Sequence, residues 1–88
     1  MPEVGYTITF TRSARREIER LPSNVVQRVY PHIEALAENP RPPGCHKIVG
    51  AQNLWRIRVG DYRVVYEVLD EAQVVDIIVV RHRSEAYR

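Results

Sequence analysis

Hydrophobic and polar positions divide the chain into a strand-like start, two helix-like segments and a strand-rich second half. In residues 5–10 (GYTITF), β-branched and aromatic side chains alternate with other residues, which predicts a short strand. The period then changes, because apolar residues in residues 11–21 recur at i, i+4 and i+7, as on one face of a helix. These apolar residues are Ala14, Ile18 and Leu21. Thr11 or Ser13 can cap this helix, and Pro22 ends it.

A second helix is predicted over residues 24–39, with Ser23 as its expected N-terminal cap. Its apolar face consists of Val26, Val29, Ile33 and Leu36. Pro31 lies inside this pattern and removes a backbone donor, so we expect the helix to be kinked or split there. The short LPS connection makes the two helices an antiparallel hairpin.

The proline-rich segment NPRPPGC separates the helices from strand-like segments in residues 46–49, 53–59, 62–69 and 74–83. One strand, two helices and then three or four strands predict an α+β fold of order β-α-α-β-β-β. In this fold the helical hairpin lies over one face of a mostly antiparallel sheet. The length of 88 residues predicts a single domain, residues 1–88.

Gly60 and Asp61 separate two of these strands and form a two-residue hairpin signal, most simply a type II′ turn. The turn places Val59 opposite Tyr62, and therefore Arg58 opposite Arg63. Side chains alternate between the two faces of a sheet. One face, which we expect under the helices, then carries Trp55, Ile57, Val59, Tyr62, Val64, Tyr66 and Val68. The other face carries Arg56, Arg58, Arg63, Val65 and Glu67.

This second face brings like charges together. Arginines directly opposite each other destabilise a strand pair, so a sequence selected for stability alone would avoid Arg58 beside Arg63. Glu67 can neutralise one arginine, with Arg56 the nearest. The set of three arginines therefore favours anion binding, and phosphate is the natural candidate. The alternative is a solvated face whose arginines bury their stems and pair with acids elsewhere.

The composition supports a basic binding surface. Of the 13 basic residues 12 are arginine, the net charge is +2 and the pI is about 9.0. A further basic cluster with an aromatic residue closes the chain: Arg81, His82, Arg83, Tyr87 and Arg88. Such a cluster can hold phosphate while stacking on a base. The bland alternative is a frayed terminus.

Several classes of protein are disfavoured by the same composition. Cys45 is the single cysteine, which excludes an internal disulfide. Cys45 and His46 are too few ligands for zinc, so we expect no metal site. There is neither a signal peptide nor an apolar run long enough to span a membrane, so we expect a cytoplasmic protein with no membrane association.

The stretch LWRIRVGDYRVVYEV, followed by an apolar strand and RHRSEAYR, resembles the RelE/ParE toxin superfamily of type II toxin–antitoxin systems. The resemblance extends to the opening strand, the helical hairpin, ENPRPPG and HKIVG, and so covers nearly the whole chain. Resemblance to the RelE branch implies a metal- and cofactor-independent endoribonuclease that cleaves messenger RNA in the ribosomal A site. The 2′-hydroxyl attacks the adjacent phosphate and a 2′,3′-cyclic phosphate results.

Matching the family's motif positions assigns the catalytic roles. Arg58 and Arg63 would stabilise charge on the phosphorane. Tyr87 would be the general base, with neighbouring arginines lowering its pKa from about 10. Arg81 would act as the general acid or as an electrostatic substitute, although arginine is a poor proton donor. Arg56, which like Arg58 stands where relatives often carry lysine, would position the RNA backbone.

Three further residues are expected to bind substrate: Lys47, His82 and Arg83. A solvated surface residue is the plain alternative for Lys47. Histidine is the obvious acid–base group near neutral pH, but strand alternation points His82 away from Arg81 and toward the helices.

Two alternatives to the ribonuclease stay open. A ParE-like protein shares the fold but inhibits DNA gyrase without being a nuclease, and an inactive member would serve only as an antitoxin's partner. All three imply a cognate, RelB-like antitoxin, and the first implies the ribosome and messenger RNA as further partners. The chain shows no DNA-reading motif, so operator DNA is expected to bind only through the antitoxin complex.

Overall fold

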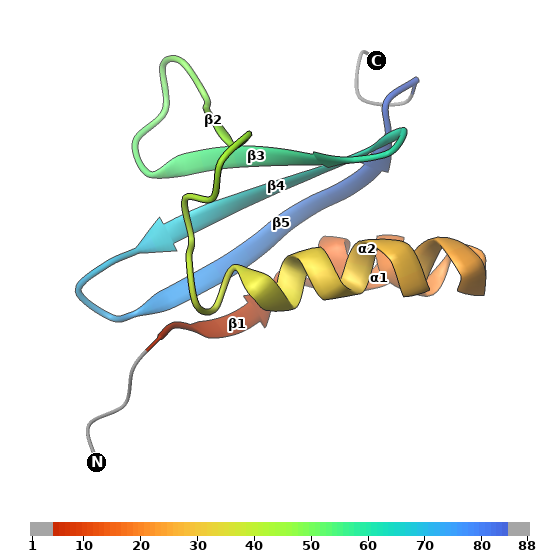
Figure 1. Ribbon diagram of the computed structural model, residues 1–88, viewed down its shortest axis with the longest axis horizontal. Helices are drawn as coiled ribbons and strands as arrows, with labels where there is room; N and C mark the ends of the chain where they lie inside the picture. The colour runs from red at the N-terminus through yellow and green to blue at the C-terminus, as the bar shows by residue number, and fades with distance from the viewer. Residues whose placement is uncertain (1–4, 85–88) are drawn as a thin grey trace.

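A computed structural model describes residues 5–84 of the chain (Figure 1). The elements follow in the order β1 (Thr7–Phe10), α1 (Arg12–Glu19), α2 (Ser23–Ala35), β2 (His46–Lys47), β3 (Leu54–Val59), β4 (Tyr62–Leu69) and β5 (Val74–His82). The predicted α+β class is confirmed, and the strand predicted over residues 46–49 is present as the two-residue β2. None of the helices in the described part of the chain has the length and apolar character needed to cross a membrane.

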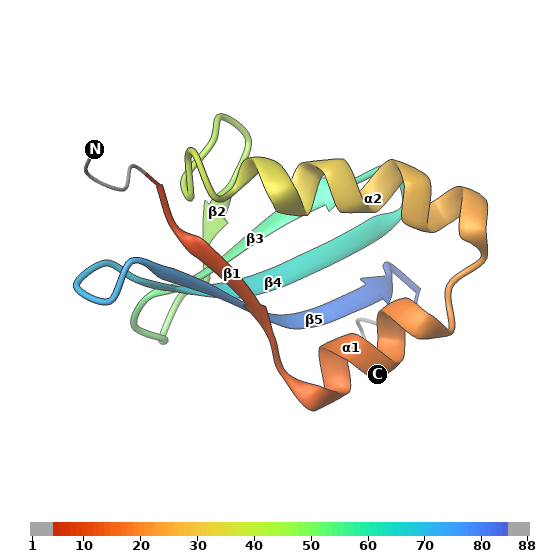
Figure 2. The same cartoon turned by 90° about the horizontal axis from the view of Figure 1, so that it is seen from below.

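The five strands form one sheet in the order β1-β5-β4-β3-β2. Neighbours pair antiparallel except β1 and β5, which run parallel. Both helices lie on the same side of this sheet, with α1 beside β5 and α2 crossing near β3 (Figures 1 and 2). The predicted hairpin over one face is therefore present, and no helix of residues 5–84 covers the opposite face of the sheet.

The first helix has a side-chain cap that the sequence predicts, and the second helix does not. Thr11 precedes α1, and its Oγ1 accepts a hydrogen bond of 3.1 Å from the Ala14 N–H. The prediction that Ser23 caps α2 is wrong, because Ser23 is already the first residue of the helix. Pro22 is in the N-cap position instead, and no side chain there accepts a hydrogen bond from the helix. The Pro22 carbonyl accepts the first hydrogen bonds of the helix, from the Val25 and Val26 N–H groups at 3.0 and 3.1 Å. The helix α2 is not split at Pro31 but continues through it to Ala35.

The β3–β4 hairpin has the predicted register, with Val59 opposite Tyr62, Arg58 opposite Arg63 and Trp55 opposite Tyr66. Gly60 has a φ of +59°, which the first position of a type II′ turn requires and which side chains other than glycine rarely adopt. The turn therefore fixes which residues of β3 and β4 share a face.

The core lies between the helices and the sheet. Ala14 of α1 and Ile33 and Leu36 of the second helical segment are almost fully buried against Val64, Val68, Val75, Ile77 and Val80 of β4 and β5. One predicted core position shifts, because α2 buries Val25 while Val26 is only half-buried. Trp55, Val59 and Tyr62 pack at the margin of this core, on the face where alternation placed them.

At one end of the sheet, side chains tie the proline-rich segment to the strands. The Tyr66 hydroxyl, on a residue with no exposed surface, donates a hydrogen bond of 2.7 Å to the Pro40 carbonyl. Burial raises the pKa of Tyr66, so the hydroxyl stays protonated and keeps donating. Asp70 accepts hydrogen bonds from Arg41 Nη2 at 2.8 Å and from the Tyr6 hydroxyl at 2.7 Å, and these bonds lower the pKa of Asp70.

Replacing Tyr66 with Phe tests this anchor. The substitution leaves the buried Pro40 carbonyl without its donor, so we expect a loss of about 1–3 kcal/mol in the free energy of unfolding by urea. The matched control is Tyr30→Phe, because Tyr30 is 39% exposed and we expect no measurable change there. Equal stability of the two variants would contradict the anchoring role of Tyr66.

Candidate phosphate-binding site

The strand pairing aligns three arginines across the face of the sheet that carries no helix. Arg58 of β3 is opposite Arg63 of β4, and Arg63 is in turn opposite Arg81 of β5. Neighbouring strands lie about 4.8 Å apart, so the three backbones stand within about 10 Å of one another. We call these residues the arginine row.

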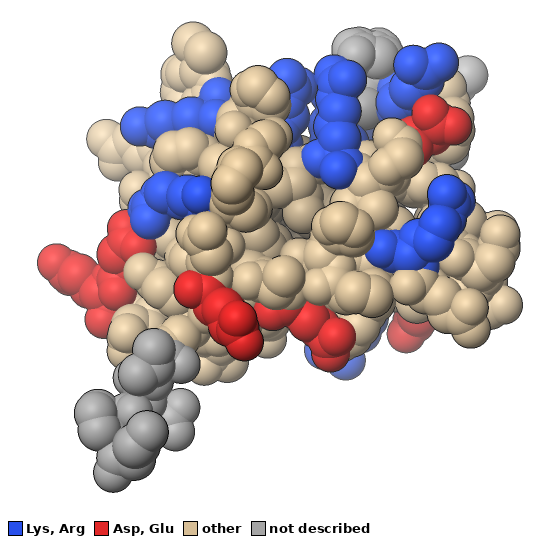
Figure 3. All heavy atoms as spheres, in the orientation of Figure 1, with Lys and Arg blue, Asp and Glu red and all other residues tan. Residues whose placement is uncertain are grey.

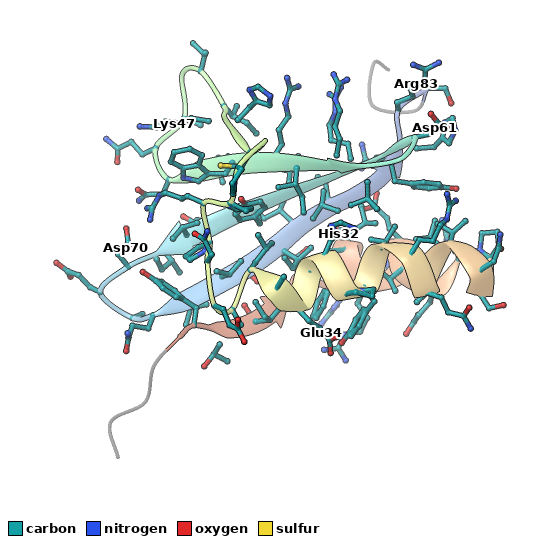
Figure 4. The ribbon with its side chains drawn as sticks, in the orientation of Figure 1. His32, Glu34, Lys47, Asp61, Asp70 and Arg83 are labelled. Carbon is teal, nitrogen blue, oxygen red and sulfur yellow. The ribbon has the colours of Figure 1, made fainter. Side chains whose placement is uncertain are left out.

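Two members of the arginine row, Arg58 and Arg63, line a hollow of about 180 Å³ beside the hairpin turn. The other residues that line it are Gly60, Asp61, Tyr62, Arg83 and Ser84. We call this the arginine hollow. Arg83 is held here because its N–H donates a 2.7 Å hydrogen bond to the Asp61 carbonyl, and its Nε lies 4.0 Å from Asp61 Oδ1. Figure 4 shows Arg83 and Asp61 together at this end of the molecule.

The third member, Arg81, lies at the edge of the sheet. Its Nε donates to Glu17 Oε2 of α1, and it lines a larger cleft of about 750 Å³. The remaining walls of this end cleft are Glu17, Arg20, Leu21, Pro22, Tyr62, Val80, His82 and Ser84. Tyr62 and Ser84 line both cavities, so the end cleft and the arginine hollow are adjacent.

His82 is on the face opposite the arginine row, as strand alternation predicts. Its ring meets Tyr62 edge-on, with ring centroids 5.2 Å apart and planes at 89°. Its Nδ1 lies 2.8 Å from the Ser84 Oγ and accepts a 3.2 Å hydrogen bond from the Ser84 N–H. His82 therefore belongs to the wall of the end cleft rather than to the arginine hollow.

The other predicted substrate-binding residues are divided between the two faces. Arg56 lies on the arginine face in the neighbouring row, and its partner there on β2 is His46. Lys47 pairs with Trp55 instead, so it lies on the helix side, with its Nζ 6.0 Å from the centroid of the Trp55 ring. Lys47 is thus at the opposite end of the sheet from Arg83 (Figure 4). Tyr87 lies outside the described residues.

Charge is distributed unevenly over the surface. On the face that Figure 3 shows, basic side chains gather along the side of β3 and the hairpin turn, and acidic ones gather along the side of the β4–β5 turn and the helices. Within residues 5–84, Arg56 and Arg58 have no ion-pair partner, and Glu67 does not neutralise Arg56. Glu67 instead faces Leu54 and Asp76 in the pairing. The same residues contain no group of three His, Cys, Asp or Glu side chains that could hold a metal ion.

A family model described as the ParE toxin of the type II toxin–antitoxin system parDE matches residues 8–87. The mRNA interferase toxin RelE of Escherichia coli is 33% identical over 94 aligned positions, covering 96% of this chain and 92% of that protein. The chain belongs to the RelE/ParE toxin superfamily. It is a type II toxin with a RelE-like structure.

Solved structures agree with this assignment of the toxin. The crystal structure of the isolated E. coli RelE toxin matches with a TM-score of 0.80 and 32% identity, covering 93% of this chain and 90% of that chain. A chain of the intact E. coli RelBE toxin–antitoxin complex matches with a TM-score of 0.79 and 30% identity, covering 88% of this chain and 95% of that chain.

The arrangement of arginines in this toxin suits phosphate. Guanidinium groups stay charged at any physiological pH and donate paired hydrogen bonds to two phosphate oxygens. Arg58, Arg63 and Arg83 converge on a hollow from three different segments, so an anion there would be approached from several sides. Binding such an anion would also relieve the repulsion between the paired arginines.

Two residues important to this geometry are Glu17 and Asp61. Asp61 was recognisable only as a turn residue, yet its carbonyl binds the Arg83 N–H, and its carboxylate lies 4.0 Å from the Arg83 Nε. Glu17 carries no local signal, because its partners Val80 and Arg81 lie more than sixty positions away in the sequence.

The salt dependence of binding tests the arginine hollow. Affinity for a single-stranded oligodeoxynucleotide is expected to fall with salt, and each lost phosphate contact lowers the log–log slope by about 0.7. We therefore expect Arg58→Gln to reduce the slope by about 0.7 in fluorescence anisotropy titrations. Arg15→Gln, on the exposed side of α1, removes the same charge away from the hollow and is expected to keep the slope. Equal slopes for the two variants would place the bound phosphates elsewhere.

Proposed function

We propose that this toxin, as one domain of residues 1–88, is a ribosome-dependent endoribonuclease that cleaves messenger RNA in the A site and so inhibits translation. The observation that carries the proposal is the arginine row, which continues into a hollow lined by Arg58, Arg63 and Arg83. A protein that acts only by binding another protein has no need of guanidinium groups converging on one phosphate-sized space. The name of the E. coli relative, mRNA interferase toxin RelE, points to the same activity.

In the proposed reaction the messenger RNA supplies its own nucleophile. The 2′-oxygen attacks the adjacent phosphorus and loses its proton, the bond to the 5′-oxygen breaks, and that oxygen takes up a proton. A 2′,3′-cyclic phosphate and a new 5′-hydroxyl result. The reaction then requires no metal or cofactor, since protein groups supply both the charge stabilisation and the proton transfers.

The arginines would act mainly through electrostatics. The attacked phosphate gains negative charge as it becomes five-coordinate, and preorganised cations stabilise that state more than the ground state. Arg58 and Arg63 line the hollow in which we place this phosphate, while Arg83 and Arg56 would hold the neighbouring backbone. We assign to Arg81 the stabilisation of the negative charge that develops on the leaving 5′-oxygen.

Proton transfer is assigned to Tyr87 as general base. A tyrosine ionises at a pKa of about 10, and nearby guanidinium groups would lower that pKa by favouring the phenolate. Arg81 and Arg83 shortly precede Tyr87 in the sequence and would supply these guanidinium groups. His82 lies across the strand from the arginine row, so we assign it to substrate contact in the end cleft rather than to the chemistry.

We further propose a RelB-like antitoxin as the partner. The solved E. coli RelBE toxin–antitoxin complex contains a chain similar to this one over most of its length. An acidic antitoxin segment would complement the arginine face. Operator DNA would then bind through the antitoxin complex, and a ribosomal target places the toxin in the cytoplasm.

A second candidate function is inhibition of DNA gyrase without nuclease activity. The observation that favours it is the description of the matching family model as a ParE toxin. The two functions differ in their demand on the arginine row, because gyrase inhibition does not require a converging phosphate site.

Mapping the 5′ ends of messenger RNA after tightly controlled expression in bacteria tests the proposal. We expect new cuts within translated codons, because the ribosome presents the A-site codon to the toxin. The Arg63→Ala/Tyr87→Phe double variant is expected to lose these cuts, since it removes both a phosphate ligand and the base. Arg15→Ala is the matched control and is expected to retain them.

Two outcomes would contradict the ribonuclease. Growth arrest with intact messages and relaxed or damaged DNA would establish the gyrase inhibitor instead. Cuts that persist in the double variant would remove Arg63 and Tyr87 from the mechanism.

A further inference from the structure

Glu17 connects α1 to the C-terminal end of β5. Its side chain is 19% exposed, and its two carboxylate oxygens have different partners. Oε1 accepts a 2.8 Å hydrogen bond from the Val80 N–H, and Oε2 accepts one from Arg81 Nε. One carboxylate thus contacts the backbone and the side chain of two successive residues of β5.

The place of Glu17 follows from the early end of β1. The pairing of β1 with β5 stops at Phe10 and Ile77, so no strand of the described residues lies beside the outer edge of β5 beyond that point. The chain crosses this edge once more, where the Thr11 N–H donates to the Ile77 carbonyl at 2.9 Å. Beyond it, α1 lies alongside β5, and Glu17 supplies the acceptor that a missing strand would have offered to Val80.

The contact with Arg81 has a separate consequence. An arginine side chain has many rotamers, and holding it in one of them costs conformational entropy. The carboxylate of Glu17 fixes the Nε edge of the guanidinium before any ligand arrives. Arg81 is thereby held where the arginine row meets the wall of the end cleft.

We propose that Glu17 is a positioning residue for catalysis, which holds the Arg81 guanidinium in the orientation that meets the leaving oxygen of the cleaved phosphate. This inference rests on the proposed ribonuclease function and deepens it. It assigns a functional role to an acidic residue that lies in a basic site and touches no RNA in the proposed arrangement.

Electrostatics alone predicts the opposite effect of Glu17. A carboxylate beside the arginine row reduces the local positive charge, so removing it should strengthen RNA binding and favour cleavage. Positioning instead predicts that removal slows the chemical step even though the site becomes more positive. The direction of the change in rate therefore separates the two roles.

Glu17→Gln is the informative variant. Its amide oxygen can still accept from Val80, so the edge of β5 keeps its hydrogen bond, while the charge that holds Arg81 is lost. Glu19→Gln is the matched control, because Glu19 is an exposed residue of the same helix and has no ion pair within the described chain. Thermal unfolding of both variants checks that the fold is retained.

We expect Glu17→Gln to lower the single-turnover cleavage rate on ribosome-bound message about ten-fold, the effect of a catalytic group held less well. Affinity for a non-cleavable 2′-deoxy message is expected to stay equal or to rise. Glu19→Gln is expected to cleave like the unmodified toxin. A Glu17→Gln rate equal to or above that of the control would overturn the proposal.

Nitrogen-15 NMR of the arginine side chains gives a readout that does not depend on cleavage. We expect the Arg81 Nε proton to exchange slowly with water in the unmodified toxin and at least ten-fold faster in Glu17→Gln, because the hydrogen bond to the carboxylate is gone. Unchanged exchange would show that Glu17 does not hold Arg81. A toxin that cuts no message but shows the predicted change in exchange would overturn the ribonuclease function while retaining the contact itself, and the catalytic role of Glu17 would fall with that function.

Discussion

The hairpin register of β3 and β4 is the constraint on which the rest of the site depends. A positive φ at Gly60 makes the two-residue turn possible, and the turn places Arg58 opposite Arg63. The pairing of β4 with β5 then adds Arg81 to the same row. A slip of one residue would send these arginines into the core and the core residues into water, so the packing of Ile57, Val64 and Tyr66 and the placement of the arginines are specified together.

The two ends of the sheet have different tasks. At one end Tyr66, Asp70 and Arg41 join the strands to the proline-rich segment through ordinary hydrogen bonds and an ion pair. At the other end like charges face each other across the strands, and within residues 5–84 Glu17 pairs with Arg81 while Asp61 approaches Arg83. The stabilising contacts thus lie away from the arginines. Their stability allows the repulsive arrangement in the site to be retained for binding an anion.

Much of this could be predicted from local patterns, because periodicity and turn chemistry act over a few residues. The register of the hairpin, the buried face of the sheet and the outward direction of the arginines followed from alternation about Gly60 and Asp61. Features of the helices that depend on packing with the rest of the chain were not predicted. Ser23 is inside its helix rather than before it, α2 continues through Pro31, and Val25 replaces Val26 in the core.

Within the site, the same distinction applies. The arginines could be selected from their positions on the strands, whereas the hold of Glu17 on Arg81 could not, because it joins a helix to a strand far away in the sequence. Lys47 was selected with the arginines as a substrate-binding residue. Its two-residue strand places it beside Trp55 on the helix side of the sheet, at the opposite end from Arg83.

The central claim is that the arginine row trades stability for anion binding. Its most direct test is the free energy of unfolding of Arg58→Gln and of the unmodified toxin, in sodium chloride and in sodium sulfate of equal ionic strength. In chloride we predict that the variant is more stable, by up to about 1 kcal/mol, because one repulsive pair is gone. In sulfate the unmodified toxin should recover this difference by binding the anion. A variant that is less stable in chloride, or equal stabilisation of both proteins by sulfate, would contradict the account.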